Sequence, residues 1–129
     1  MKAGGTSTGG SNPYKLAKLC AEVALEKKAE NVVLLEIKEL TDIADYFVIL
    51  SANSGTHIKS IADYIEETVK EKLQDKVAYR DGSGTAGWLV LDYISVIVHI
   101  LLPEKRKFYD LEGWWADAPK EELVYESVS

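Results

Sequence analysis

Apolar residues recur at helical spacing in two stretches of the chain. The first stripe consists of Leu16, Leu19, Cys20, Val23 and Ala24. This spacing predicts an amphipathic helix that begins at Asn12 and Pro13, because asparagine caps helices and proline suits the first helical position. The second stripe extends from Ile58 to Leu73 with charged residues on the opposite face, and Ser54 is its predicted N-cap.

Shorter apolar runs predict five β-strands. They lie at residues 32–38, 45–51, 77–80, 87–92 and 95–102. Continuous apolar runs are typical of a sheet that is covered on both faces. The short gap between the last two runs allows only an antiparallel hairpin, whereas the helix after residue 51 permits a parallel crossover. A final helix is predicted over residues 104–115, after Pro103.

The order of these elements predicts the fold class. It is a single compact α/β (α+β) domain with a mixed five-stranded sheet flanked by helices. A chain of 129 residues is long enough for one such core. Residues 1–12 are rich in Gly, Ser and Thr, which predicts a flexible leader, and residues 120–129 are expected to form an acidic, mobile tail. The predicted domain is therefore 13–119.

Charge and composition limit the partners. Acidic residues outnumber basic ones by 21 to 15, and a net charge of −6 disfavours direct nucleic-acid binding, sequence-specific recognition included. An acidic surface does suit a basic protein partner. No apolar run approaches the ~20 residues of a membrane span and no secretory signal is evident, so we expect no membrane partner and a cytoplasmic location. The single cysteine, Cys20, excludes an intrachain disulfide.

The candidate catalytic groups lack neighbours with which to react. The glycine-rich segment 82–87 joins two predicted strands, whereas a phosphate-binding loop would lead into a helix and carry a lysine. Asp92 is the only acid in residues 88–102, and the chain has no Asp-x-Asp pair for two-metal chemistry. His57 and His99 show no metal-ligand spacing. We therefore predict a protein that is not an enzyme, with no catalytic residue, metal or cofactor.

Large aromatic residues gather in the last third of the chain. They are Trp88, Tyr93, Phe108, Tyr109, Trp114 and Trp115. Phe108 and Trp115 share one face of the predicted last helix, which is typical of core packing. Trp88 and Tyr109 instead fit a protein interface, where aromatic residues are enriched. The residues alone leave both an interface and a larger core open, and they favour an interaction protein over an enzyme.

Several ordered segments resemble one known family. They are ADYFVILS at 44–51, HIKSIADYIEE at 57–67, GWLVLDY at 87–93, VIVHILLPEKRKFYDLE at 96–112 and WADAP at 115–119. With these segments in order and at the right separations, the chain resembles the ribosomal silencing factor family (RsfS, Iojap-like) from about residue 15 to residue 119. The resemblance implies a nucleotidyltransferase-like fold that has lost its catalytic carboxylates.

The same resemblance implies a ribosome-binding translation repressor. Such a protein docks on the large ribosomal subunit, through a basic ribosomal protein on the subunit-joining face (the fourteenth protein of that subunit), and sterically blocks joining of the small subunit when nutrients are short. The resemblance also implies a homodimer when the protein is free. The positions that match the family's binding residues are Trp88, Leu91, Asp92, Tyr93, His99, Lys105, Arg106 and Tyr109.

Two alternatives accompany this reading. Plastid and mitochondrial relatives are linked to assembly of the large subunit, which would use the same contact. A nucleotide-binding or nucleotidyltransferase-like domain is supported only by the implied fold and by segment 82–87.

The chain also departs from the family at three places. Ile94-Ser95 stands where Gly-Asp is usual, so that a flexible turn and a carboxylate are lost. Ser51-Ala52 replaces Thr-Gly or Ser-Gly, and Gly113-Trp114 replaces a charged residue and leucine.

Overall fold

The structure, a computed structural model, describes residues 12–124. Its elements are α1 (Pro13–Glu26), β2 (Glu30–Glu36), β3 (Tyr46–Ser51), α2 (Gly55–Leu73), β4 (Tyr79–Ser83), β5 (Trp88–Asp92), β6 (Val96–Leu101), α3 (Pro103–Tyr109), α4 (Leu111–Trp114) and β7 (Lys120–Leu123). The predicted caps of the two long helices are confirmed. Asn12 Oδ1 accepts the Lys15 N–H at 3.2 Å, and Ser54 Oγ accepts the His57 N–H at 3.0 Å.

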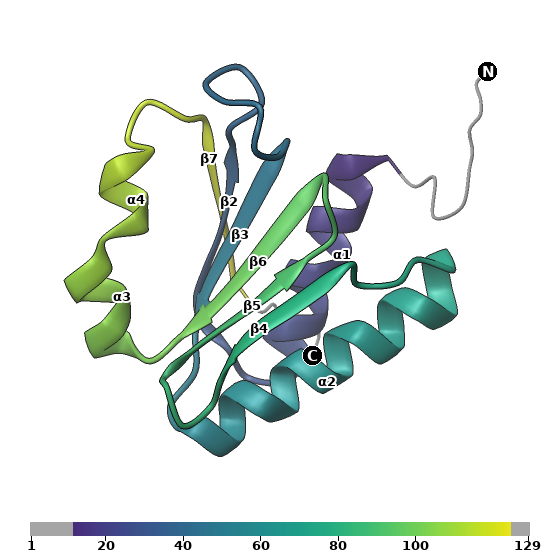
Figure 1. The fold of residues 1–129 in the computed structure, drawn as a ribbon, viewed down its shortest axis with the longest axis vertical. Coiled ribbons are helices and arrows are strands. Elements are labelled where there is room, and N and C mark those ends of the chain that lie inside the picture. The colour runs from purple at the N-terminus through teal and green to yellow at the C-terminus, as the bar shows by residue number, and fades with distance from the viewer. Residues whose placement is uncertain (1–11, 125–129) are drawn as a thin grey trace.

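Within the described residues, the six strands form one mixed sheet in the order β4-β5-β6-β3-β2-β7 (Figure 1). β3 and β6 pair in parallel, and all other neighbours in this sheet are antiparallel. The predicted β5–β6 hairpin and the parallel crossover through α2 are therefore confirmed. The sheet has six strands where the sequence predicted five.

The additional strand, β7, lies in the segment predicted to be a mobile tail. It pairs with β2, and its alternate residues Glu121 and Leu123 are the half-buried ones. Lys18 Nζ of α1 lies 2.6 Å from Glu121 Oε2, and this contact lowers the pKa of Glu121. The tail prediction is wrong for residues 120–123, because an acidic strand can still bury one face. Residues 125–129 and the predicted leader 1–11 lie outside the described residues.

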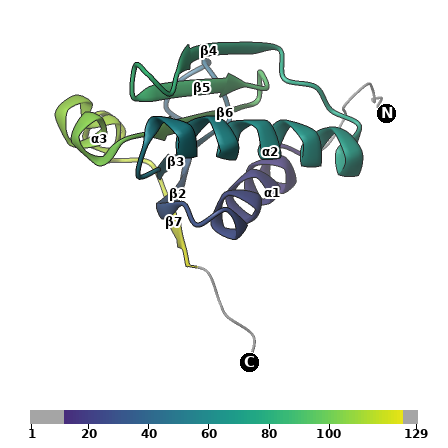
Figure 2. The same ribbon diagram turned by 90° about the horizontal axis from the view of Figure 1, so that it is seen from below.

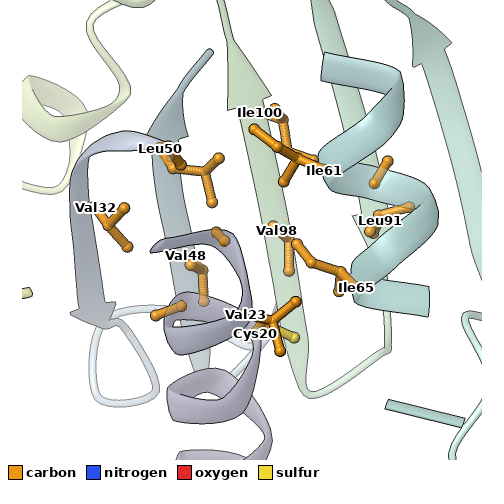
Figure 3. Close-up of a cluster of buried hydrophobic side chains, with 14 of the residues drawn as sticks. Cys20, Val23, Val32, Val48, Leu50, Ile61, Ile65, Leu91, Val98 and Ile100 are labelled. Carbon is orange, nitrogen blue, oxygen red and sulfur yellow. The ribbon is translucent and has the colours of Figure 1, made fainter. Parts of the chain in front are cut away.

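α1 and α2 together cover one face of the sheet, and α3 lies on the other side (Figure 2). Figure 3 labels Cys20 and Val23 of α1, Ile61 and Ile65 of α2, and their strand partners Val32, Val48, Leu50, Leu91, Val98 and Ile100. Cys20 is completely buried, and this burial raises the pKa of its thiol. Cys20 thus packs as a small apolar residue of the core, as its place on the first predicted stripe indicates.

The predicted helix over 104–115 is wrong as a continuous element. Asp110 has a left-handed backbone, with φ at 49°, and it separates α3 from α4. Its side chain then caps α4 by accepting the Gly113 N–H at 3.2 Å. The break changes the helical phase, so that Phe108 is 78% exposed and is not a core residue.

The glycine-rich segment packs against the start of α2 by its backbone. A Cβ atom added to Gly84 would lie 2.1 Å from the Gly55 carbonyl oxygen, and one added to Gly55 would lie 2.7 Å from the Gly84 oxygen. Two chain segments approach here more closely than any side chain would permit. β4 itself extends over 79–83, later than the predicted 77–80, and so includes Gly82 and Ser83.

Replacing Gly84 by alanine should destabilise the fold. The new methyl group must push α2 and the β4–β5 turn apart, which costs about 1–3 kcal/mol of unfolding free energy. Urea unfolding of Gly84→Ala against the parent measures this cost. Thr85→Ala, in the same exposed turn, is the control and should change the unfolding free energy by less than about 0.5 kcal/mol. Equal stability of Gly84→Ala and the parent would contradict the close approach.

Candidate functional site

The face of the sheet opposite α1 and α2 carries the candidate site. Its buried side chains are Val33, Leu35, Ile37, Ala44, Phe47, Ile49, Ile97, Leu101 and Ala118. Leu111 and Trp115, from α4 and its C-cap, pack against them. β5 presents half-buried Trp88, Val90 and Asp92 to this face, because alternate residues of a strand point the same way. We call this surface the aromatic face.

Three of the predicted binding residues meet at one end of the aromatic face. The Trp88 indole Nε1–H donates to His99 Nδ1 at 3.2 Å. Tyr109 of α3 contacts the same indole, with ring centroids 4.7 Å apart, and Phe108 stands edge-on to Tyr109 at 5.0 Å. The result is a continuous series of rings that runs from the buried imidazole to the surface.

His99 is the buried end of that series. Its side chain is 7% exposed and contacts the Phe47 ring edge-on, with centroids 4.7 Å apart. Burial lowers the pKa of His99 from 6.5 to about 4, so the imidazole is neutral at pH 7. Because Nδ1 accepts the Trp88 hydrogen bond, the ring proton is on Nε2, which has no hydrogen-bond partner among residues 12–124. This histidine is a packed aromatic group rather than a poised base.

Lys105 and Arg106 have different environments. The Arg106 guanidinium binds Glu112 through two contacts, of 2.9 and 3.2 Å, and Ser51 Oγ at 3.0 Å. Arg106 lowers the pKa of Glu112. Arg106 thus joins α3 to α4 and to the end of β3. Lys105 packs its carbon chain beside Gly87, where an added Cβ would lie 3.3 Å from the lysine Cγ.

The remaining three predicted residues divide between the two faces. Asp92 ends β5 on the aromatic face, and its Oδ1 accepts the Ile94 N–H at 2.8 Å. Leu91 and Tyr93 are buried on the opposite face, beneath α1 and α2. Burial raises the pKa of the Tyr93 hydroxyl, which has no hydrogen-bond partner within the described part of the chain. The structure therefore brings Trp88, His99 and Tyr109 together and holds Leu91 and Tyr93 away from them.

Two aromatic side chains near the site are exposed, which the sequence did not predict. Phe108 and Trp114 are 78% and 81% exposed, among the largest apolar side chains at the surface. The available signal was the sequence Asp-Leu-Glu-Gly at 110–113, in which Asp110 is a helix N-cap that restarts the helix. Phe108 contacts Tyr109 and so enlarges the aromatic face, whereas Trp114 is an exposed residue of α4.

The possible metal ligands and the glycine-rich segment 82–87 are arranged differently from metal-binding and phosphate-binding sites. Within residues 12–124, no three histidine, cysteine, aspartate or glutamate side chains converge as metal ligands would. Segment 82–87 lies against the first turn of α2, with the Gly84 backbone beside Gly55, where a phosphate would have to lie. In the described part of the chain, no helix has both the length and the hydropathy of a bilayer span.

The fold and the site define a small α+β domain with a mixed sheet, one face of which presents clustered aromatic residues. Comparison with known proteins agrees with this class. The family model described as "Ribosomal silencing factor during starvation" matches residues 11–128, and the chain belongs to that family.

Individual relatives cover most of the chain. It is 31% identical over 114 residues to the ribosomal silencing factor RsfS of Bacillus subtilis, covering 88% of this chain and 96% of that protein. The corresponding protein of Halalkalibacterium halodurans is 34% identical over 109 residues, which is 84% of this chain and 92% of that one. A mouse protein named "Mitochondrial assembly of ribosomal large subunit protein 1" is 28% identical over 92 residues, 70% of this chain and 40% of that protein.

Solved structures show the same fold. A Bacillus halodurans protein matches with a TM-score of 0.72 at 30% identity, covering 85% of this chain and 99% of that one. A Chromobacterium violaceum protein matches with a TM-score of 0.78 at 23% identity, covering 89% and 95%. The predicted α+β class and mixed sheet are thus confirmed.

The buried neutral histidine predicts a specific pH dependence of stability. Below pH 6.5 the unfolded chain protonates its histidine while folded His99 stays neutral, so stability is lost as the pH falls toward 4. Between pH 7 and pH 5 this group alone should remove about 2 kcal/mol of unfolding free energy. His99→Gln should lack this component, whereas acids such as Glu112 and Glu121 contribute equally to both proteins. Urea unfolding at the two pH values measures it, and equal losses in parent and variant would contradict the prediction.

Proposed function

We propose that this protein is a non-enzymatic, ribosome-associated translation repressor that docks on the large ribosomal subunit. The aromatic face binds a basic ribosomal protein on the subunit-joining face, the fourteenth protein of that subunit, and the bound protein sterically blocks the small subunit. Action in the cytoplasm during nutrient starvation and a homodimeric free state belong to the same proposal. The family match over residues 11–128 supports the ribosomal part of it.

One structural observation carries the docking surface. The rings of Trp88 and Tyr109 contact each other near the surface, tilted by 48° with centroids 4.7 Å apart, beside the exposed Phe108. Aromatic residues that are held rigidly and partly exposed are the usual anchors of protein interfaces. The net charge of −6 favours a basic partner, since complementary charge steers association.

The eight matched positions then take two roles in the proposal. Contact with the partner is assigned to Trp88, Asp92, Lys105 and Tyr109, and support of those residues to Leu91, Tyr93, His99 and Arg106. The division follows from burial for Leu91, Tyr93 and His99, because a side chain inside the core has no surface to offer a partner. For Arg106 it follows from the contacts of the guanidinium with Glu112 and Ser51, which already occupy that group.

Assembly of the large subunit is a second candidate function. The mouse relative's name supports it, and docking on the same subunit would serve either role. Depletion of the protein separates the two. Accumulation of precursor large subunits during growth favours assembly, whereas normal subunits with unrepressed translation in stationary phase favour silencing.

Nucleotide binding is the rival from another class. Calorimetric titration of the protein with ATP and Mg²⁺ tests it. Because the Gly84 backbone lies against the first turn of α2, we expect no heat of binding. A saturable heat with defined stoichiometry would favour the nucleotide-binding alternative.

Removing either surface ring should weaken docking. Trp88→Ala and Tyr109→Ala should each weaken binding to isolated large subunits by roughly 30-fold or more, because interface anchors of this type contribute about 2 kcal/mol or more. Co-sedimentation with large subunits measures binding, and light scattering on adding small subunits measures the block to joining.

The matched control is Tyr14→Ala. Tyr14 is 41% exposed against 42% for Tyr109, but it lies on α1 at the opposite face. This variant should bind like the parent. If Trp88→Ala and Tyr109→Ala also bind like the parent while remaining folded by circular dichroism, the docking surface is elsewhere. If the parent itself does not sediment with large subunits, the proposed function is wrong.

A further inference from the structure

The turn between β5 and β6 contains a strained and exposed isoleucine. Ile94 has φ at 73°, in the left-handed region, and it is 61% exposed. A β-branched residue in this region is a genuine outlier, since its side chain crowds the backbone. Glycine or asparagine would adopt the same conformation at lower cost. Packing within the protein does not account for Ile94, because most of its side chain faces solvent.

The surrounding hydrogen bonds hold the turn in this conformation. Asp92 Oδ1 accepts the Ile94 N–H at 2.8 Å, and the Tyr93 N–H donates to the Val96 carbonyl at 2.8 Å. The Ser95 carbonyl accepts N–H groups from Asp45 at 2.8 Å and Tyr46 at 3.1 Å, at the start of β3. The turn is thus tied to the neighbouring central strand. Ile94 is therefore presented to solvent on a rigid support rather than on a loose loop.

Ile94 lies in the turn that follows β5, at the end of the aromatic face remote from Trp88. Trp88, Val90 and Asp92 face one way along β5, and the turn follows directly. Tyr79 of β4 is the register partner of Asp92, so it shares that face, and it is 67% exposed. An exposed apolar residue, an exposed tyrosine and a carboxylate therefore lie at this end of the hairpin.

We infer that Ile94 is an additional apolar anchor by which the aromatic face binds its ribosomal protein. This inference rests on the proposed function and extends its docking surface. The occupant is the basic ribosomal protein of that proposal, with an apolar side chain against Ile94 and a cation beside Asp92. No ion pair among residues 12–124 uses the Asp92 carboxylate. A strained residue that is retained at a surface is explained when binding, rather than folding, requires it.

Replacing Ile94 should separate folding from binding. Ile94→Gly and Ile94→Asn both relieve the left-handed strain and remove the apolar group. Each should raise the melting temperature by a few degrees and weaken co-sedimentation with large subunits from the source organism by about tenfold. Asparagine is included because it tolerates this backbone without the flexibility of glycine. Opposite changes in stability and affinity are the signature of an anchor, since a merely structural residue would lower both.

Lys28→Gly is the matched control for strain relief. Lys28 is exposed with φ at 66°, and it precedes Glu30, whose partner Ser51 lies at the other end of β3 from the turn. It should gain stability and keep the parent's affinity. If the two Ile94 variants bind like the parent while Trp88→Ala loses binding, the inference is overturned and the proposed function stands. If the parent itself fails to bind large subunits, both the inference and the proposed function are wrong.

Discussion

The central pair of strands sets the main constraint on this fold. Every residue of β3 and β6 is buried, so both faces of the sheet need cover at its centre. α1 and α2 cover one face with long apolar stripes. Among residues 12–124, the other face is covered by the short α3 and α4, with Leu111 and Trp115 as packing residues, and by Ala118. Both faces of the sheet are apolar, but the layer formed by α3 and α4 is smaller than that formed by α1 and α2. Aromatic rings therefore remain at the edge of the smaller layer, where the aromatic face lies.

The position of that thinner layer depends on polar contacts more than on burial. α3 and α4 contain no buried residue. The Arg106 guanidinium, with a side chain that is 12% exposed, instead links Glu112 of α4 to Ser51 at the end of β3. Charge-assisted, bidentate contacts of this kind fix orientation as well as distance. The contact of Tyr109 with Trp88 therefore depends on Arg106, whose own side chain is mostly buried.

Local signals explain why much of the fold could be predicted from the sequence. The helix caps, the buried runs and the short β5–β6 connection each act within a few residues. β7 could not be predicted, because its stabilising contacts with β2 and Lys18 come from distant parts of the chain and its sequence is acidic. The same reason applies to His99. Its direct partner across the hairpin is Val90, so the hydrogen bond from Trp88 is diagonal and requires the register to be known.

Two polar side chains of the β5–β6 hairpin, His99 and Asp92, hold neighbouring residues in place. His99 accepts the Trp88 hydrogen bond and stays neutral, and Asp92 uses one carboxylate oxygen to hold the turn. General acid–base chemistry requires the acid and the base to lie within hydrogen-bond reach of a reacting atom. Asp92 and His99 instead make their hydrogen bonds to Ile94 and Trp88. Their common effect is to fix the indole at one end of β5 and the apolar side chain of Ile94 at the other. His99 and Asp92 therefore each act on a neighbouring residue of the hairpin rather than on each other.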